Sequence, residues 1–177
     1  MPRDATDQTS ETNVLLPDLL TTTGATIAPL RSLLESAKDC VRDLVVVDGR
    51  VSAARIEAEQ TASHGLAWLA TYVEALAQMQ VWAEKISAEG KFGEVEQLIH
   101  QIAFSEYLWQ IYGGIPMTQG EILRLQDIGL TQDQMRCLME PAVQTLTQGG
   151  NTQAARMRLV ALMQERSAEV TVGNVGL

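Results

Sequence analysis

The chain has 177 residues, of which 46% are hydrophobic, and it carries a formal net charge of −9 with an isoelectric point near 4.7. A chain of this length buries roughly 70% of its unfolded surface, so we expect one compact domain. The acidic balance argues against binding to nucleic acid or to an anionic membrane, because both depend on Lys and Arg. No run approaches the roughly 18 apolar residues of a membrane span, and no secretory leader is visible. We therefore expect a soluble, cytoplasmic protein.

The first third of the chain predicts a polar tail and one long helix. Residues 1–12 lack aromatic side chains and are expected to be disordered. Pro17 permits a short helical turn over 15–20, and a helix is predicted over 27–47. Its apolar residues recur every three or four positions: Leu30, Leu33, Leu34, Ala37, Val41 and Leu44. The valines before Asp48 could instead form a strand, but no second β-rich run offers a pairing partner, so we interpret them as the end of the helix.

Residues 52–88 contain no proline and one glycine, which predicts a single very long helix. It carries two apolar stripes. One stripe consists of Leu66, Leu69, Val73 and Leu76, and the other of Trp68, Tyr72, Met79, Trp82 and Ile86. Two stripes imply partners on two sides. We therefore predict that Trp68, Tyr72, Met79 and Trp82 form an exposed patch that another protein body, or a second copy of the chain, covers.

A third helix is predicted over 92–112, with Val95, Leu98, Ile99, Ile102, Ala103 and Ile111 on its buried face. Gly113-Gly114 is expected to end it, with positive φ at Gly113. The sequence then shows a series of shorter helix signals. These are capping boxes at Thr118/Glu121 and Thr131/Gln134, a kink or split before Pro141, and a cap at Asn151 for a last helix that reaches about Ser167. The predicted fold is an all-α helical bundle over 13–168, followed by a tail or linker over 169–177.

Residues that could carry chemistry are few. His64, His100, Cys40 and Cys137 show no metal-ligand spacing, so no metal site is predicted. Glu74 and Glu84 could act as bases on an apolar helix, but the polar side of that helix is the expected place for them. Glu94, Glu96 and Glu106 have the same two interpretations. Glu106 is expected to be partly buried, with Arg124, Tyr72 or a backbone amide as its partner. Trp68, Trp82 and Trp109 could line a flavin or acyl pocket, or belong to the core.

Two segments carry a resemblance to a known family. They are HGLAWLATYVEALAQMQVWAEKI at 64–86 and FGEVEQLIHQIAFSEYLWQIYGGIPMTQGEI at 92–122. Both resemble the helical N-terminal extension of the methylsuccinyl-CoA dehydrogenases, which belong to the flavin-dependent acyl-CoA dehydrogenase superfamily. The similarity is close over about one third of the chain and looser from Ile27 to Met163.

Residues 110–114, QIYGG, also resemble the Q-x-x-G-G turn with which acyl-CoA dehydrogenases contact the flavin nucleotide of a neighbouring subunit. The resemblance marks Gln110, Gly113 and Gly114 as cofactor-binding candidates. Ile115-Pro116-Met117 stands where the family has a glycine and an aromatic residue, so we interpret the match as a duplicated bundle that kept its helix stop. The resemblance implies FAD in the parent enzyme, where a glutamate removes the α-proton of a branched acyl-CoA while hydride passes to the flavin.

The leading hypothesis is a non-catalytic helical module of an acyl-CoA dehydrogenase, which binds no cofactor itself and packs on the catalytic body or on a neighbouring subunit. The alternatives are a free-standing, all-helical flavin- or CoA-dependent enzyme with Glu106 or Glu74 as its base, and an interaction adaptor. A homodimer is a further possible arrangement, built through the patch on the long helix.

Overall fold

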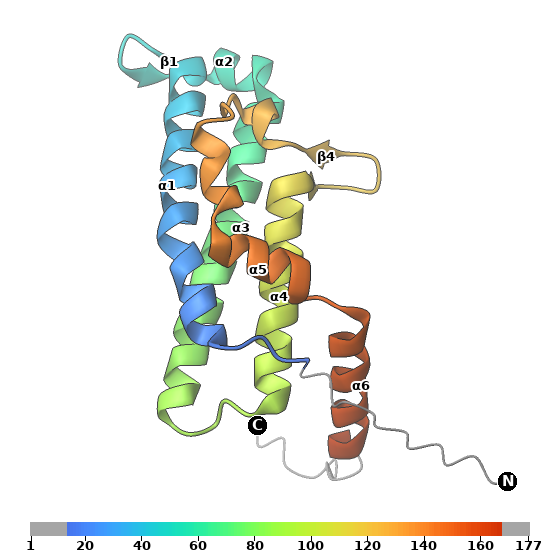
Figure 1. The fold of residues 1–177 in the computed structure, drawn as a ribbon. Coiled ribbons are helices and arrows are strands. Elements are labelled where there is room, and N and C mark those ends of the chain that lie inside the picture. The colour runs from blue at the N-terminus through green and yellow to red at the C-terminus, as the bar shows by residue number, and fades with distance from the viewer. Residues whose placement is uncertain (1–13, 168–177) are drawn as a thin grey trace, which may run out of the picture.

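The computed structural model describes residues 14–167 of the chain. Three long helices stand side by side: α1 (Leu19–Val45), α3 (Gln60–Ala88) and α4 (Glu94–Gly113). They run alternately up and down, and a returning segment crosses them (Figure 1). That segment consists of two 3₁₀ helices, η1 (Leu125–Ile128) and η2 (Gln134–Met139), followed by α5 (Pro141–Gly149). The predicted all-α bundle is therefore confirmed, whereas the predicted tails, residues 1–12 and 169–177, lie outside the described residues.

The core lies between α1, α3, α4 and the returning segment. Its fully buried members include several leucines of the predicted stripes. Leu30, Leu33 and Ala37 come from α1 and Leu69, Val73 and Leu76 from α3, each set with the spacing of one helical face. On α4 the buried face is Val95, Leu98, Phe104, Leu108 and Ile111. Ile99 is exposed there, and Ile102 and Ala103 are half-buried, so the predicted stripe was placed partly on the wrong side.

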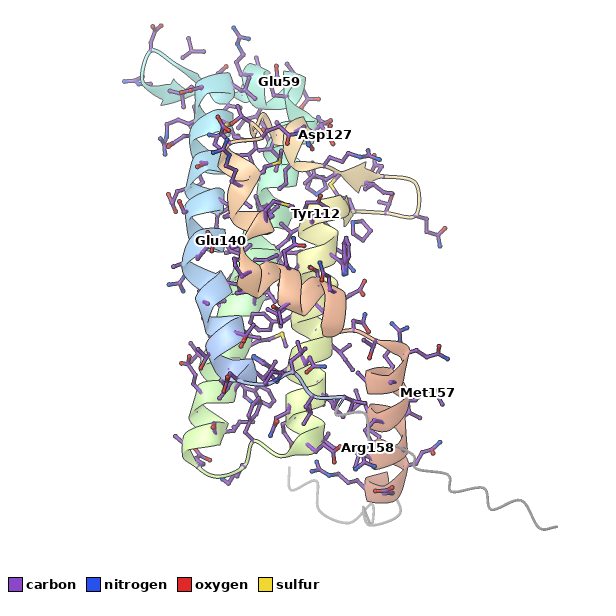
Figure 2. The ribbon with its side chains drawn as sticks, in the orientation of Figure 1. Glu59, Tyr112, Asp127, Glu140, Met157 and Arg158 are labelled. Atoms are coloured by element: carbon purple, nitrogen blue, oxygen red, sulfur yellow. The ribbon has the colours of Figure 1, made fainter. Side chains whose placement is uncertain are left out.

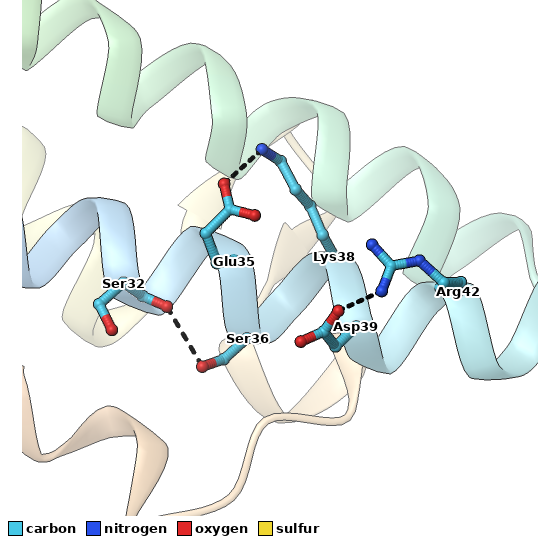
Figure 3. Close-up of polar contacts among 6 residues, drawn as sticks. All are labelled: Ser32, Glu35, Ser36, Lys38, Asp39 and Arg42. Atoms are coloured by element: carbon cyan, nitrogen blue, oxygen red, sulfur yellow. Dashed lines mark hydrogen bonds and ion pairs between the residues drawn. The ribbon is translucent and has the colours of Figure 1, made fainter.

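The outer face of α1 carries charged and polar side chains at helical spacing. Lys38 pairs with Glu35 at 2.7 Å, Arg42 pairs with Asp39, and the Ser36 hydroxyl donates to the carbonyl of Ser32 (Figure 3). Such exposed pairs contribute little to stability, because water screens them and holding the side chains costs entropy. They mark the solvent side of the helix, and the leucine face opposite them points into the bundle.

Two boundaries of the long helices differ from the prediction. α1 begins at Leu19 rather than 27, with Pro29 inside it. The single helix over 52–88 is two helices, α2 (Ala53–Ala58) and α3, which are separated at Glu59, where φ is −110° and ψ is 38°. No proline or glycine accounts for this break. Ser52 caps α2, since its side chain accepts from the backbone N–H of Arg55.

The valines after α1 form a strand after all. β1 (Val46–Val47) pairs antiparallel with β2 (Arg50–Val51) across a two-residue turn. Asp48 and Gly49 form that turn with φ of 49° and 74°. Positive φ at both positions matches the right-handed twist of a hairpin, and Asp-Gly is a preferred sequence for it. We expected these valines to end the helix because no pairing partner was found for them. The strand just beyond the turn is that partner, so the expectation was wrong.

A second hairpin replaces the helix that was predicted to open at Thr118. β3 (Ile115–Pro116) pairs with β4 (Ile122–Leu123), and the loop between them carries Thr118. The Thr118 hydroxyl accepts from the backbone N–H groups of Gly120 and Glu121, at 3.3 and 3.2 Å, and thereby closes the loop. A threonine can stabilise a turn or a helix start with the same hydrogen bonds, so the prediction of a helix here was wrong.

The remaining helix signals were mostly correct. Thr131 and Gln134 exchange the reciprocal hydrogen bonds of a capping box, although the helix that follows, η2, is 3₁₀. Pro141 is the first residue of α5, so the chain splits before it as predicted. α6 (Gln153–Ser167) is the last helix, but Thr152 caps it by accepting from the backbone N–H of Ala155. Asn151 instead binds the Glu106 carboxylate.

The helix stop at the end of α4 depends on Gly114 and not on Gly113. Gly114 has φ of 135°, and a Cβ there would lie 2.4 Å from Cγ2 of Ile122, whereas a Cβ on Gly113 would meet no atom within 4 Å. The expected positive φ at Gly113 was therefore wrong by one residue. We predict that Gly114→Ala lowers the free energy of unfolding by about 1–3 kcal/mol. Gly113→Ala, within the helix, should be neutral or raise it by up to about 1 kcal/mol. Urea unfolding of both variants measures the difference, and equal effects would contradict this assignment.

Candidate functional site

The three cofactor-binding candidates lie together at the C-terminal end of α4. Gly114 donates its backbone N–H to the carbonyl of Gln110 at 2.8 Å. Gly113 lines a cleft of about 540 Å³, together with Arg124, residues of η2 and Tyr112, which Figure 2 labels. Of the three candidates, Gly113 is the one that lines this cleft. Their role in binding a nucleotide stays a prediction.

The side chain of Gln110 is engaged within the bundle. The Tyr72 hydroxyl donates to its Oε1 at 2.5 Å, and its Nε2 donates to Oε1 of Glu106 at 2.8 Å. The other carboxylate oxygen of Glu106 accepts from the amide of Asn151 at 2.8 Å. Glu106 is exposed rather than partly buried, and its partners are two amides rather than Arg124 or a direct bond to Tyr72. This network links α3, α4 and the loop before α6.

The hydroxyl of Tyr72 in this network has a raised pKa. Burial raises the pKa of its hydroxyl above the ordinary value, and the nearby Tyr107 and Glu106 raise it further by disfavouring a second negative charge. A hydroxyl that keeps its proton remains a hydrogen-bond donor, which matches its contact with the Gln110 carbonyl oxygen. The arrangement fixes the amide orientation of Gln110, with its NH₂ group turned to Glu106.

The cleft beside Gly113 combines aromatic, sulfur-containing and cationic side chains. Tyr112 and Met139 are about half exposed on its wall, and Trp109 packs edge-on against Tyr112 with ring centroids 6.0 Å apart. Asp133 lies in the same wall and pairs with Arg136 at 3.0 Å. Side chains of these types are common in binding surfaces. The cleft therefore combines apolar surface with charged groups of both signs.

The other glutamates that were weighed as bases have structural partners or face solvent. Glu74 and Glu84 are exposed on α3 and accept hydrogen bonds from Gln78 and Gln80. Glu94 and Glu96 bind arginines of α6, and these hydrogen bonds lower the pKa of both carboxyl groups below the ordinary value. These last two pairs were not predicted. Sequence spacing gives no signal for them, because the partners lie 64 and 70 positions apart.

His100 lies at the centre of the bundle and is fully buried. Its Nε2 is 3.1 Å from the Thr23 hydroxyl, which in turn is 2.7 Å from Oε1 of Gln80. The NH₂ group of Gln80 faces two acceptors, the carbonyl of Leu20 and the carboxylate of Glu84, so its oxygen must face Thr23. Since Thr23 has one proton and donates it to an oxygen, Nε2 of His100 carries the ring proton. The Nδ1 atom has no partner in the described part of the chain. Burial lowers the pKa of His100 to about 4.

The remaining candidates occupy separate places. Exposed His64 accepts from the indole N–H of Trp68 at 3.1 Å. Cys40 and Cys137 are free and half-buried. Within residues 14–167, no three His, Cys, Asp or Glu side chains gather as metal ligands, and no helix is long and apolar enough to cross a membrane. The tryptophans do not share one pocket: Trp68 contacts Tyr72, Trp82 contacts Phe92 and Trp109 contacts Tyr112.

The predicted patch on α3 is only partly at the surface. Trp82 is 39% exposed, Trp68 and Met79 are partly buried against the core, and Tyr72 is buried. The role of these four residues as an interface stays a prediction. Apolar side chains with a larger exposed fraction than Trp82 lie on other elements. They are Trp109, Tyr112 and Met139 beside the cleft and Met157, Val160 and Met163 on α6.

Comparison with known proteins adds one relative. No protein-family model matches the chain. The chain is 50% identical over 165 residues to (2S)-methylsuccinyl-CoA dehydrogenase of Cereibacter sphaeroides. The match takes in 92% of this chain but 29% of the relative, so it extends well beyond the two segments from which the resemblance was inferred. The chain therefore matches, over 92% of its length, one part of a methylsuccinyl-CoA dehydrogenase.

Proposed function

We propose that this chain is a non-catalytic helical module of a flavin-dependent acyl-CoA dehydrogenase of the methylsuccinyl-CoA type. In this proposal it packs on the catalytic body or a neighbouring subunit and shapes access to the acyl-CoA site. The observation that carries the proposal is the 50% identity to methylsuccinyl-CoA dehydrogenase over 92% of the chain, which spans only 29% of that enzyme. The parent reaction is α,β-dehydrogenation of a branched acyl-CoA, for which FAD supplies the hydride acceptor.

The distribution of polar groups supports a structural role for the module. An α-proton base needs a carboxylate that faces the bound thioester in a cleft closed to water. Glu106 is held by two amides, Glu94 and Glu96 bind arginines, and Glu74 is exposed. Gln110 is likewise occupied on both sides of its amide. We therefore propose that Gln110, Gly113 and Gly114 now serve to end α4 and to hold Tyr72, as remnants of a nucleotide-binding turn.

The proposal is tested with the isolated 177-residue chain and with a full-length chimera. In the chimera this chain replaces the matched segment of the Cereibacter sphaeroides enzyme. We expect the isolated chain to be colourless and to reduce no dye with methylsuccinyl-CoA, because the base and the flavin site belong to the rest of the enzyme. The chimera should be yellow and active. Bound flavin or dye reduction with the isolated chain would support the free-standing enzyme instead.

A further inference from the structure

Two arginines attach α6 to its own bundle. The guanidinium of Arg158 donates from Nε and Nη2 to the two carboxylate oxygens of Glu94, both at 2.7 Å. Arg166 donates from Nη1 to Glu96 at 2.9 Å. Both glutamates belong to the first turn of α4, and α4 is the main neighbour of α6. Of the α6 side chains, Ala155 is the one that is fully buried.

The opposite side of the same helix is apolar and exposed. Met157 is 64% exposed, Val160 53% and Met163 54%. They follow one another at intervals of three, and together with Ala161 they form the apolar part of one side of α6, which we call the outer α6 face. A shallow groove of about 420 Å³ on this face is lined by residues of α6 alone, with Gln153, Arg156 and Gln164 as its polar members. Figure 2 places Arg158 toward α4, whereas Met157 lies on the other side of the helix.

A helix whose only neighbour is its own bundle buries its large apolar side chains. α6 does so only in part: Ala155 is buried and Leu159 and Leu162 are half-buried, and two ion pairs add to the attachment to α4. Among residues 14–167, nothing covers the three large apolar side chains on the other side. Exposed apolar side chains gathered on one side of a helix are typical of a docking surface.

We propose that the outer α6 face is the surface on which the part of the dehydrogenase outside the matched segment packs. This inference rests on the proposed function and adds the contact surface to it. The relative supplies the occupant, because more than two thirds of that enzyme lies outside the match. The occupant's surface is expected to be apolar at its centre, to match two methionines and a valine.

The size of the face argues against a second copy as the occupant. A helix of 15 residues is about 22 Å long and about 10 Å wide, so two such faces together bury on the order of 500 Å². Stable interfaces bury about 1,200 Å² or more in total. A larger body can extend the contact beyond α6 and reach that area, whereas two copies joined through α6 alone do not.

Methionine footprinting tests the surface without any substitution. The isolated chain and the full-length chimera are exposed to hydroxyl radicals, and oxidation of each methionine is followed by mass spectrometry. We expect Met157 and Met163 to be oxidised readily in the isolated chain and roughly tenfold more slowly in the chimera, as for side chains that enter an interface core. Met139 beside the cleft, which is 57% exposed, reports on a different surface of the same module.

A matched pair of variants shows whether the outer α6 face causes the protection. Val160→Glu adds a charge to this face, and Val81→Glu makes the same change on α3 at a valine that is 57% exposed. Both sites are in water in the isolated chain, so both variants should keep its helical circular dichroism. In the chimera, Val160→Glu should return the oxidation of Met157 and Met163 to the rate of the isolated chain. Val81→Glu should leave the protection intact.

Each other outcome overturns the proposal in a recognisable way. Protection of Met139 without protection of Met157 and Met163 means that the module packs through another face, and the proposed function stands. Equal oxidation of all three methionines in both proteins means that neither the outer α6 face nor the cleft is an interface, which overturns this inference; the activity of the chimera then tests the proposed function by itself. Protection of Met157 and Met163 already in the isolated chain, with a dimer in light scattering, makes a second copy the occupant.

Discussion

Leu69→Ala and Leu98→Ala each lower the free energy of unfolding by roughly 2 to 5 kcal/mol. Both leucines are fully buried, the first at the middle of α3 and the second in α4. Removing each side chain takes away apolar contacts and leaves a cavity that the neighbouring helices fill only in part. The loss is a large share of the total, because a domain of this size is stable by about 5–15 kcal/mol. Urea unfolding of the isolated chain, followed by circular dichroism, measures it.

Ile99→Ala is the matched control for this pair. Ile99 follows Leu98 in α4 but is 41% exposed, so the substitution removes a comparable number of carbon atoms from a much wetter site. Its cost should be about 1 kcal/mol or less. A cost for Ile99→Ala as large as that for Leu98→Ala, or costs below about 0.5 kcal/mol for both buried leucines, would contradict the packing described above.

The long helices could be predicted from the sequence because their signals are local. Leucines at spacings of three and four identify the buried faces of α1 and α3, and Pro141 marks the start of α5. The register of α4 was harder to predict, because apolar residues occur on more than one side of it, and the stripe was assigned to Ile99 instead of Phe104. Periodicity predicts that a helix exists. When a helix has apolar residues on all sides, however, the elements that pack against it decide which side is buried.

The two hairpins and the polar contacts depend on information that periodicity does not carry. Asp48-Gly49 is a local hairpin signal, and the strands on either side of it are too short to show an alternating pattern. Thr118 and Glu121 have the spacing of a capping box, yet the pairing of Ile115 with Leu123 across the loop decides the local structure. Glu106 meets Asn151 from 45 positions away, so its environment could not be predicted from α4 alone.

The polar cluster in the core gives the stability of the protein a specific dependence on pH. His100 has a pKa of about 4 in the folded protein against the ordinary histidine value of 6.5, since burial disfavours its charged form. The unfolded chain therefore binds a proton between these two values that the folded protein does not bind. Stability is complete above pH 6.5 and falls as the pH is lowered from 6.5 toward 4. We expect the free energy of unfolding to be about 2 kcal/mol lower at pH 5 than at pH 7.5.

His100→Gln tests the origin of this slope. The variant loses stability at all pH values, because the buried ring packs against Phe104 and Phe92. Its free energy of unfolding should nevertheless change by less than about 0.5 kcal/mol between pH 7.5 and 5, since glutamine does not titrate. Above pH 5 the carboxyls of Glu94 and Glu96 stay ionised, because arginine contacts lower their pKa. His64→Gln leaves His100 in place and should keep the slope, and a slope that survives His100→Gln would place its cause in another group.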